Sequence, residues 1–206
     1  IFGLILLFFL IQLEIITYAF EKLGFSTWQV FLILLGSLLG SMINVPLKEL
    51  PCDQPIQEKT VSAFGMQYRI PSPQQRCTVL AMNVGGAMIP TLVSLSLLLR
   101  GPLLMPLVAT AIVALIVNRI SRPVQGLGIA TPALIPPIIT LLVVFILSPE
   151  DAPRVAYIAG TMGTLIGADL MNLKKISDLG APIASIGGAG TFDGIFITGI
   201  LAVLLA

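Results

Sequence analysis

The chain has 206 residues, of which 56% are hydrophobic and 10% are charged, with a formal net charge of +1 and a mean hydropathy of +1.02. An ordinary soluble domain has about a quarter charged residues, so we expect an integral membrane protein in which residues 1–206 form a single transmembrane domain. The small net charge, without a clustered basic face, argues against nucleic-acid binding. Because the chain has no histidine, any chemistry must use carboxylates, hydroxyls, amides or the two cysteines.

Seven apolar segments follow one another along the chain, and each approaches the roughly 20 residues that a spanning helix needs. Their hydrophobicity is continuous rather than alternating, which favours helices over the strands of a barrel. The sequence therefore predicts an all-α polytopic bundle of about seven transmembrane helices, at residues 1–20, 28–47, 79–98, 102–118, 126–147, 155–172 and 191–206.

The longest polar connection is the loop at residues 48–78. Its stretch TVSAFGMQYRIP alternates weakly around Gly65 and is rich in β-forming residues, which predicts a short hairpin ended by Pro71. A hairpin edge can pair with an unfolded polypeptide, although most such loops only connect helices. Cys52 and Cys77 fit no zinc signature and form either a disulfide or two unrelated thiols.

Lysine and arginine are distributed unevenly between the two sides of the predicted bundle. By the positive-inside rule, the richer side faces the cytoplasm. This places the amino terminus, the 48–78 loop and the 173–190 loop in the cytoplasm and the whole chain in the cell membrane. The richer side holds Lys48, Lys59, Arg69, Arg76, Arg119, Arg122, Lys174 and Lys175, and the other side holds Lys22, Arg100 and Arg154.

The fifth segment, GLGIATPALIPPIITLL, carries so many glycines and prolines that its helix is expected to break. Irregular backbone at membrane depth occurs where protein or a water-filled cavity satisfies it. Broken helices of transporters bind ions or substrates at their exposed ends, and such a break would equally admit water to a hydrolytic site. The alternative is a simple kink near the cytoplasmic entry of the helix.

Two aspartates lie within the last two apolar segments. Asp169 lies about one turn before the sixth segment ends, and Asp193 lies in the first turn of the seventh, so both are expected near the cytoplasmic face on neighbouring helices. A charged residue in a span is costly and is therefore a candidate for function. The alternative is that each aspartate caps a helix end, which suits Asp193 better than Asp169 because an anion is disfavoured near a helix C-terminus.

Small and polar residues surround the two acids. Gly160, Gly163 and Gly167 recur at helical spacing, which lets helices approach closely within one chain or in a homo-oligomer. Other polar residues near the same side are expected to line a cavity or to form interhelical hydrogen bonds; they are Asn44, Asn83, Asn172 and Thr191.

Two carboxylates brought within hydrogen-bonding distance in a dry site cannot both ionise easily, so they share a proton. One carboxylate then activates water while the other protonates the substrate carbonyl, which permits peptide hydrolysis without histidine or a metal. The sequence therefore favours a membrane-embedded aspartic protease that acts on a polypeptide substrate and needs no cofactor.

At these residues the chain resembles the presenilin-like intramembrane aspartyl proteases, which carry one aspartate on each of two consecutive helices and a Pro-Ala-Leu motif. The resemblance implies Asp169 and Asp193 as the dyad, with Pro132, Ala133 and Leu134 as the tripeptide, which here precedes both aspartates. The stretch FGMQYRIP and the two aspartate-bearing helices are also similar to an archaeal and bacterial family of multi-pass proteins of unknown function, for which a membrane aspartic protease role has been suggested.

Two other functions use the same acids. A transporter would use Asp169 and Asp193 as a cation or proton site beside the broken fifth segment. A divalent-cation-binding protein would use Asp169 and Asp193 as ligands, with Asn172 and Thr191, for Mg²⁺ or Ca²⁺.

Overall fold

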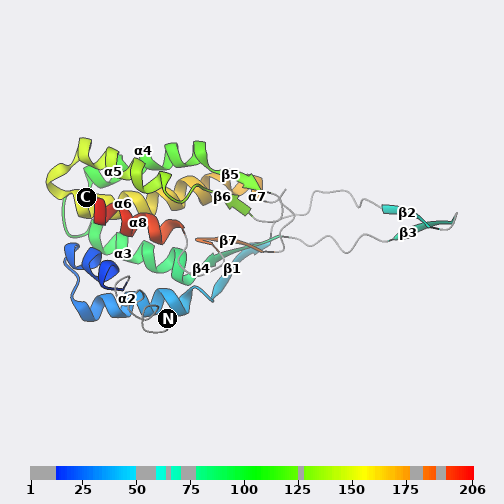
Figure 1. Ribbon diagram of the computed structural model, residues 1–206, viewed down its shortest axis with the longest axis horizontal. Coiled ribbons are helices and arrows are strands. Elements are labelled where there is room, and N and C mark those ends of the chain that lie inside the picture. The colour runs from blue at the N-terminus through cyan, green and yellow to red at the C-terminus, as the bar shows by residue number, and fades with distance from the viewer. Residues whose placement is uncertain are drawn as a thin grey trace, which may run out of the picture.

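The computed structural model describes residues 13–49, 59–63, 66–70, 78–124, 128–176, 183–188 and 194–206. The chain is mostly helical, as the sequence predicts, and its helices form a bundle (Figure 1). The helices are residues 13–22 and then α2 (Thr27–Gly40), α3 (Ile89–Leu98), α4 (Leu104–Ile120), α5 (Ile135–Leu147), α6 (Ala152–Thr164), α7 (Leu173–Ile176) and α8 (Gly194–Leu205).

Helix α6 lies at the centre of the bundle and contacts α3, α4, α5 and α8. Residues 155–161 of this helix are all buried, as expected for a helix with neighbours on several sides. The predicted glycine stripe supports the close packing. A Cβ on Gly163 would lie 2.7 Å from Val113 Cγ1 of α4, and a Cβ on Gly167 would lie 2.4 Å from the Ala114 oxygen of the same helix.

The helical axis of α6 continues through three short segments to residue 176. A π-helical turn, η3 (Leu165–Asp169), is followed by the 3-10 turn η4 (Leu170–Asn172) and then by α7. The Leu170 N–H bonds to the Leu165 oxygen, five residues back. Single π-turns inside α-helices occur frequently at functional sites, and this one ends at Asp169.

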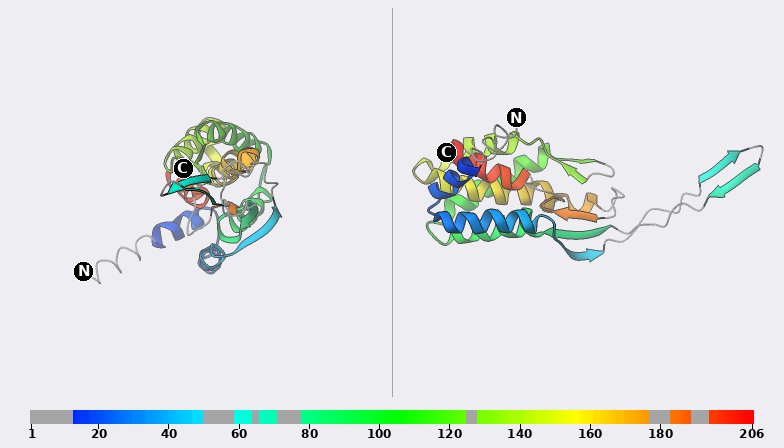
Figure 2. Two further views of the ribbon diagram at one scale, coloured as in Figure 1. Left: turned by 90° about the vertical axis from the view of Figure 1, so that its right-hand side faces the viewer. Right: turned by 60° about the horizontal axis from the view of Figure 1, so that its bottom comes forward.

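A sheet that the sequence analysis does not predict lies at one end of the bundle (Figures 1 and 2). It has three strands in the order β1–β4–β7, namely β1 (Asn44–Glu49), β4 (Val79–Asn83) and β7 (Ile183–Ile186). Strand β4 pairs antiparallel with β1, where Asn44 opposes Asn83, and parallel with β7, where Ala81 opposes Ser185. The sheet thus joins three chain segments at the end of the bundle where Asp169 lies, just beyond α6.

Three of the predicted spans are not continuous helices. The end of segment 28–47 is strand β1, and the start of segment 79–98 is strand β4 followed by the π-helix η1 (Val84–Met88). Segment 126–147 is broken as expected, because β5 (Arg122–Val124) and β6 (Gly128–Ala130) form a small hairpin before α5 begins at Ile135. Apolar strands therefore extend apolar helices, and hydropathy alone does not distinguish the two.

Within the described residues, no helix combines the length and the apolar character that a membrane crossing requires. The described α-helices have 4 to 17 residues. Helix α4 is as long as its predicted segment, whereas α2, α3, α5, α6 and α8 are shorter than theirs. The hairpin predicted in the 48–78 loop is confirmed: β2 (Lys59–Ala63) and β3 (Met66–Ile70) pair antiparallel, with Lys59 opposite Ile70.

Arg100 and Arg154 lie at the end of the bundle opposite the sheet. The Arg100 Nη1 donates to the Leu23 oxygen at 3.1 Å, and Arg154 donates to the oxygens of Leu97 and Pro102 at 3.2 and 3.1 Å. Arg154 also pairs with Asp151 through Nε at 2.7 Å. We call this the arginine end and the other the sheet end, where β1, β5 and α7 lie (Figure 1).

Candidate functional site

The site is built around Asp169 at the sheet end of the α6 axis. Asp169 is half-buried, and its Oδ2 accepts a hydrogen bond from the Gly187 backbone N–H at 2.8 Å. Gly187 immediately follows β7 and has a φ of +81°, a conformation that favours glycine. The carboxylate of the sixth predicted segment is therefore bound to the loop that leads to the seventh.

Gly187 is itself packed tightly against the π-helix η1. A Cβ on Gly86 would lie 2.1 Å from the Gly187 oxygen, and a Cβ on Gly187 would lie 2.6 Å from the Ala87 nitrogen. Both glycines are thus required by close backbone approach. Because Gly187 cannot shift toward η1, its N–H is held in place opposite Asp169.

The structure brings Asn44 and Asn83 together beside this contact. Asn83 is buried; its Nδ2 donates to the Ser41 oxygen at 2.8 Å and to Asn44 Oδ1 at 3.1 Å, while its Oδ1 accepts from the Gly86 N–H at 2.7 Å. The Ser185 hydroxyl donates to Asn44 Oδ1 at 2.6 Å. A continuous set of contacts therefore runs from the two asparagines through Gly86 and Gly187 to Asp169.

Asn172 is fully buried, but its amide is used within its own helical run. Its Nδ2 donates to the oxygens of Gly167 and Ala168, at 3.2 and 2.8 Å, and its Oδ1 accepts from Lys175 Nζ at 2.9 Å. Asn118 of α4 also donates to the Gly167 oxygen, at 3.0 Å. These amides satisfy carbonyls around the π-turn, where regular hydrogen bonding is interrupted.

The remaining predicted site residues lie apart from this set or outside the described chain. Pro132, Ala133 and Leu134 are exposed residues before α5, and Leu134 has an exposed fraction of 66%. Ile129 of β6, shortly before the tripeptide, packs in the same cluster as Ala168. Asp193 and Thr191 lie outside the described residues, so the dyad itself is not described.

The described neighbours of Asp193 lie close to those of Asp169. Ile195, two residues after Asp193, is buried in a cluster with Leu165 at the start of the π-turn and with Ile186 of β7. Helix α8 therefore begins against the same turn that ends at Asp169. No group of three or more acidic or cysteine side chains that would hold a metal ion occurs within the described ranges.

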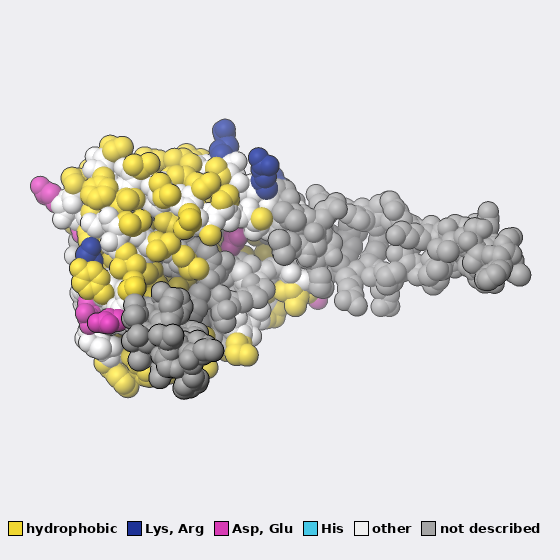
Figure 3. Space-filling view, in the orientation of Figure 1, with side chains coloured by type: hydrophobic (Ala, Val, Ile, Leu, Met, Phe, Trp, Pro, Cys, Tyr) yellow, Lys and Arg dark blue, Asp and Glu magenta, His cyan; other side chains and the backbone are white. Residues whose placement is uncertain are grey.

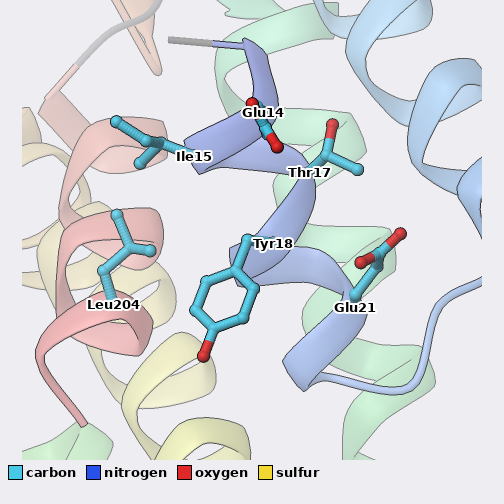
Figure 4. Close-up of a pocket in the computed structure, with 6 residues that line it drawn as sticks. All are labelled: Glu14, Ile15, Thr17, Tyr18, Glu21 and Leu204. Atoms are coloured by element: carbon cyan, nitrogen blue, oxygen red, sulfur yellow. The ribbon is translucent and has the colours of Figure 1, made fainter. Parts of the chain in front are cut away.

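A separate cavity of about 480 Å³ lies at the surface beside residues 13–22 (Figure 4). It is lined by Glu14, Ile15, Thr17, Tyr18, Glu21 and Leu204. Ile15 and Tyr18 lie between the helix and Leu204 of α8, while Glu21 lies on the side of the helix away from Leu204 (Figure 4). Helix α8 begins at the sheet end and ends here, so this cavity is remote from Asp169.

Sequence analysis did not identify Gly86, Gly187 or Ser185. The one signal in the sequence is the pair of Gly-Gly dipeptides, Gly85-Gly86 and Gly187-Gly188, each directly after an apolar stretch that forms a strand. Such dipeptides mark a turn or a close backbone approach, but they do not reveal that the two approach each other.

Taken together, these features define a helical bundle with a small mixed sheet and a hydrogen-bonded carboxylate where the two meet. The chain belongs to the family described as protein of unknown function (DUF1614), whose model matches residues 38–205. No curated protein and no solved structure matches the chain.

Proposed function

We propose that this protein is a membrane-embedded aspartic protease whose dyad is Asp169 and Asp193. The observation that carries the proposal is the 2.8 Å hydrogen bond from the Gly187 N–H to Asp169 Oδ2, because it fixes a carboxylate beside the loop that contains Asp193. The packing of Ile195 against Leu165 supports the same juxtaposition from the other side of Asp193.

The chemistry needs only the two carboxyl groups, a water molecule and a peptide bond. The ionised carboxylate takes a proton from water as the water oxygen attacks the carbonyl carbon, and the protonated carboxyl gives its proton to the carbonyl oxygen. The resulting diol collapses as its C–N bond breaks and the amide nitrogen takes up a proton. The dyad returns to its shared-proton state.

Placement in a bilayer is part of the proposal and is supported by the surface of the helices. The outward face of α2 carries Trp28, Phe31, Leu32 and Leu35, each with an exposed fraction between 39% and 66%. Figure 3 shows many hydrophobic side chains on the face of the bundle that it draws, with Lys and Arg side chains near the strands and at the opposite end. A helix that is apolar both inside and outside the bundle suits a lipid environment.

The test of the function is cleavage of an unfolded protein by the purified chain in detergent. Asp169→Asn and Asp193→Asn are each expected to lower the rate about a hundredfold or more, since each removes one member of the acid-base pair. If both variants cleave as fast as the wild type, the protease function is wrong.

A cation or proton transporter is the second candidate. It is favoured by buried hydroxyl groups on α6 that have no hydrogen-bond partner within the described chain. These hydroxyls lie along α6 between the arginine end and Asp169.

A further inference from the structure

The interior of α6 carries a row of hydroxyl groups. Tyr157, Thr161 and Thr164 follow one another at helical spacing, and their exposed fractions are 1%, 0% and 3%. Among the described residues, none of the three hydroxyl oxygens has a partner in good hydrogen-bonding geometry, although the Tyr157 and Thr161 hydroxyls lie near each other. A buried hydroxyl without a partner is destabilising, so three on one helix call for an explanation.

Other buried threonines of the bundle donate their hydroxyl hydrogen to a backbone oxygen of their own helix. The Thr110 hydroxyl donates back to the Pro106 oxygen of its own helix at 2.7 Å, and Thr140 does the same to Pro136 at 2.8 Å. Thr161 and Thr164 do not make this bond, although it is available to a helical threonine. Their hydroxyls are therefore available for a hydrogen bond to another partner.

Gly199 of helix α8 packs against this row of hydroxyl groups. A Cβ on Gly199 would lie 2.4 Å from Thr161 Oγ1 and 3.3 Å from Tyr157 Cε2. Any larger side chain at this position would displace the Thr161 hydroxyl. The interface between α6 and α8 is thus shaped around polar oxygens, not only around apolar contacts.

The row spans much of the bundle and ends near Asp169. The twelve residues from Tyr157 to Asp169 correspond to about 18 Å along a helix. Tyr157 lies among Ala19, Phe20, Leu23 and Ile200, near the arginine end. The row therefore lies between the arginine end and the carboxylate of Asp169.

The π-turn brings Asp169 into line with this row. In an α-helix, positions five apart lie on different faces, but a π-turn closes its hydrogen bonds over five residues, so position 169 returns to the side of position 164. Successive groups in the row are then separated by about one helical turn, roughly 5.4 Å. Two hydrogen bonds of about 2.8 Å through one water molecule span such a gap.

We propose that the interface of α6 and α8 is a proton path, in which water molecules link the hydroxyls of Tyr157, Thr161 and Thr164 to Asp169. Hydroxyl groups and water both donate and accept hydrogen bonds, so a proton entering at the arginine end is passed along the row, is taken up by the Asp169 carboxylate and is then released to water at the sheet end. No other ion is carried. The inference rests on the bilayer placement proposed above but not on proteolysis.

The test is proton uptake by liposomes that contain the purified protein and a pH-sensitive dye, driven by a potassium diffusion potential. Wild type is expected to acidify the interior faster than protein-free liposomes do. Thr161→Val and Thr164→Val keep the side-chain shape but remove a link, so each is expected to slow uptake about tenfold or more. Thr161→Ser keeps the hydroxyl and is expected to restore it.

Thr110→Val is the matched control, because it removes a buried hydroxyl of α4 that lies outside the row. It is expected to leave uptake unchanged. Asp193→Asn is expected to abolish cleavage but not uptake, which separates this inference from the protease function. Uptake that equals that of protein-free liposomes, or that falls equally in Thr110→Val and Thr161→Val, would overturn the proton path.

Discussion

Among the glycines of the predicted stripe, Gly167 of η3 makes the closest approach to α4. Gly167→Ala would place a methyl group 2.4 Å from the Ala114 backbone oxygen, and a backbone oxygen cannot move aside as a flexible side chain can. Overpacking of this kind costs about 1–3 kcal/mol, which exceeds the roughly 1 kcal/mol that alanine gains over glycine in a helix. We expect a lower free energy of unfolding, measured by denaturant titration in detergent.

Gly160→Ala is the control for that measurement. A Cβ at Gly160 would meet its nearest atoms, in Thr140 and Thr198, at 3.4 Å, which is ordinary van der Waals contact. This variant is expected to be neutral or slightly more stable than the wild type. Equal destabilisation by both variants would show that the short distance at Gly167 is not the cause of the lower free energy of unfolding.

Among the individual residues of the candidate site, only some could be predicted from the sequence. Asp169 stands out because a carboxylate in an apolar segment is costly. Gly187 does not, since it acts through its backbone N–H, and any residue type except proline has that group. Asn44 and Asn83 are visible as polar residues, but their 3.1 Å contact joins positions 39 residues apart, and one sequence carries no signal for such a pairing.

Among the strands, β4 is the one that is paired on both sides, with β1 and with β7. Strands β2 and β3 each pair only with one another. Backbone amide hydrogens exchange most slowly where exchange requires a larger part of the structure to unfold. We expect hydrogen exchange, followed by mass spectrometry, to be markedly slower in β4 than in β2 and β3. Similar exchange rates in all three strands would contradict the position of β4 between two paired neighbours.

The helices of the bundle could be predicted more fully than the strands. Long apolar runs with few breaking residues predict the limits of α4 to within a few residues, and likewise those of α6 when the turns that continue it to Asn172 are included. Strands β1 and β4 could not be separated from the helices beside them, because both elements are apolar and the runs have no gap. What distinguishes strand from helix in these runs is chemical detail, namely Pro46 in β1 and the Gly85-Gly86 pair in the π-helix between β4 and α3.

For the whole molecule, the distribution of basic residues predicts that the sheet end faces the cytoplasm. In a chain with Cys52 and Cys77 replaced by serine, Glu150→Cys places one thiol near the arginine end and Arg122→Cys places one at the sheet end. Both residues are exposed. A membrane-impermeant maleimide is expected to label the first in intact cells and the second only after permeabilisation. Equal labelling of both in intact cells would contradict this orientation and the bilayer placement.

The central claim is that Asp169 and Asp193 act together in peptide hydrolysis, and cleavage of casein by the purified protein in detergent tests it most directly. The assay compares the wild type with Asp169→Asn, Asp193→Asn and the control Glu150→Gln, which alters an exposed acid away from the sheet end, between about pH 4 and 8 with and without a chelator. We expect both aspartate variants to lose cleavage, while Glu150→Gln retains it and the chelator has no effect. Cleavage that survives both aspartate substitutions, or that disappears with the chelator, would contradict the metal-free dyad.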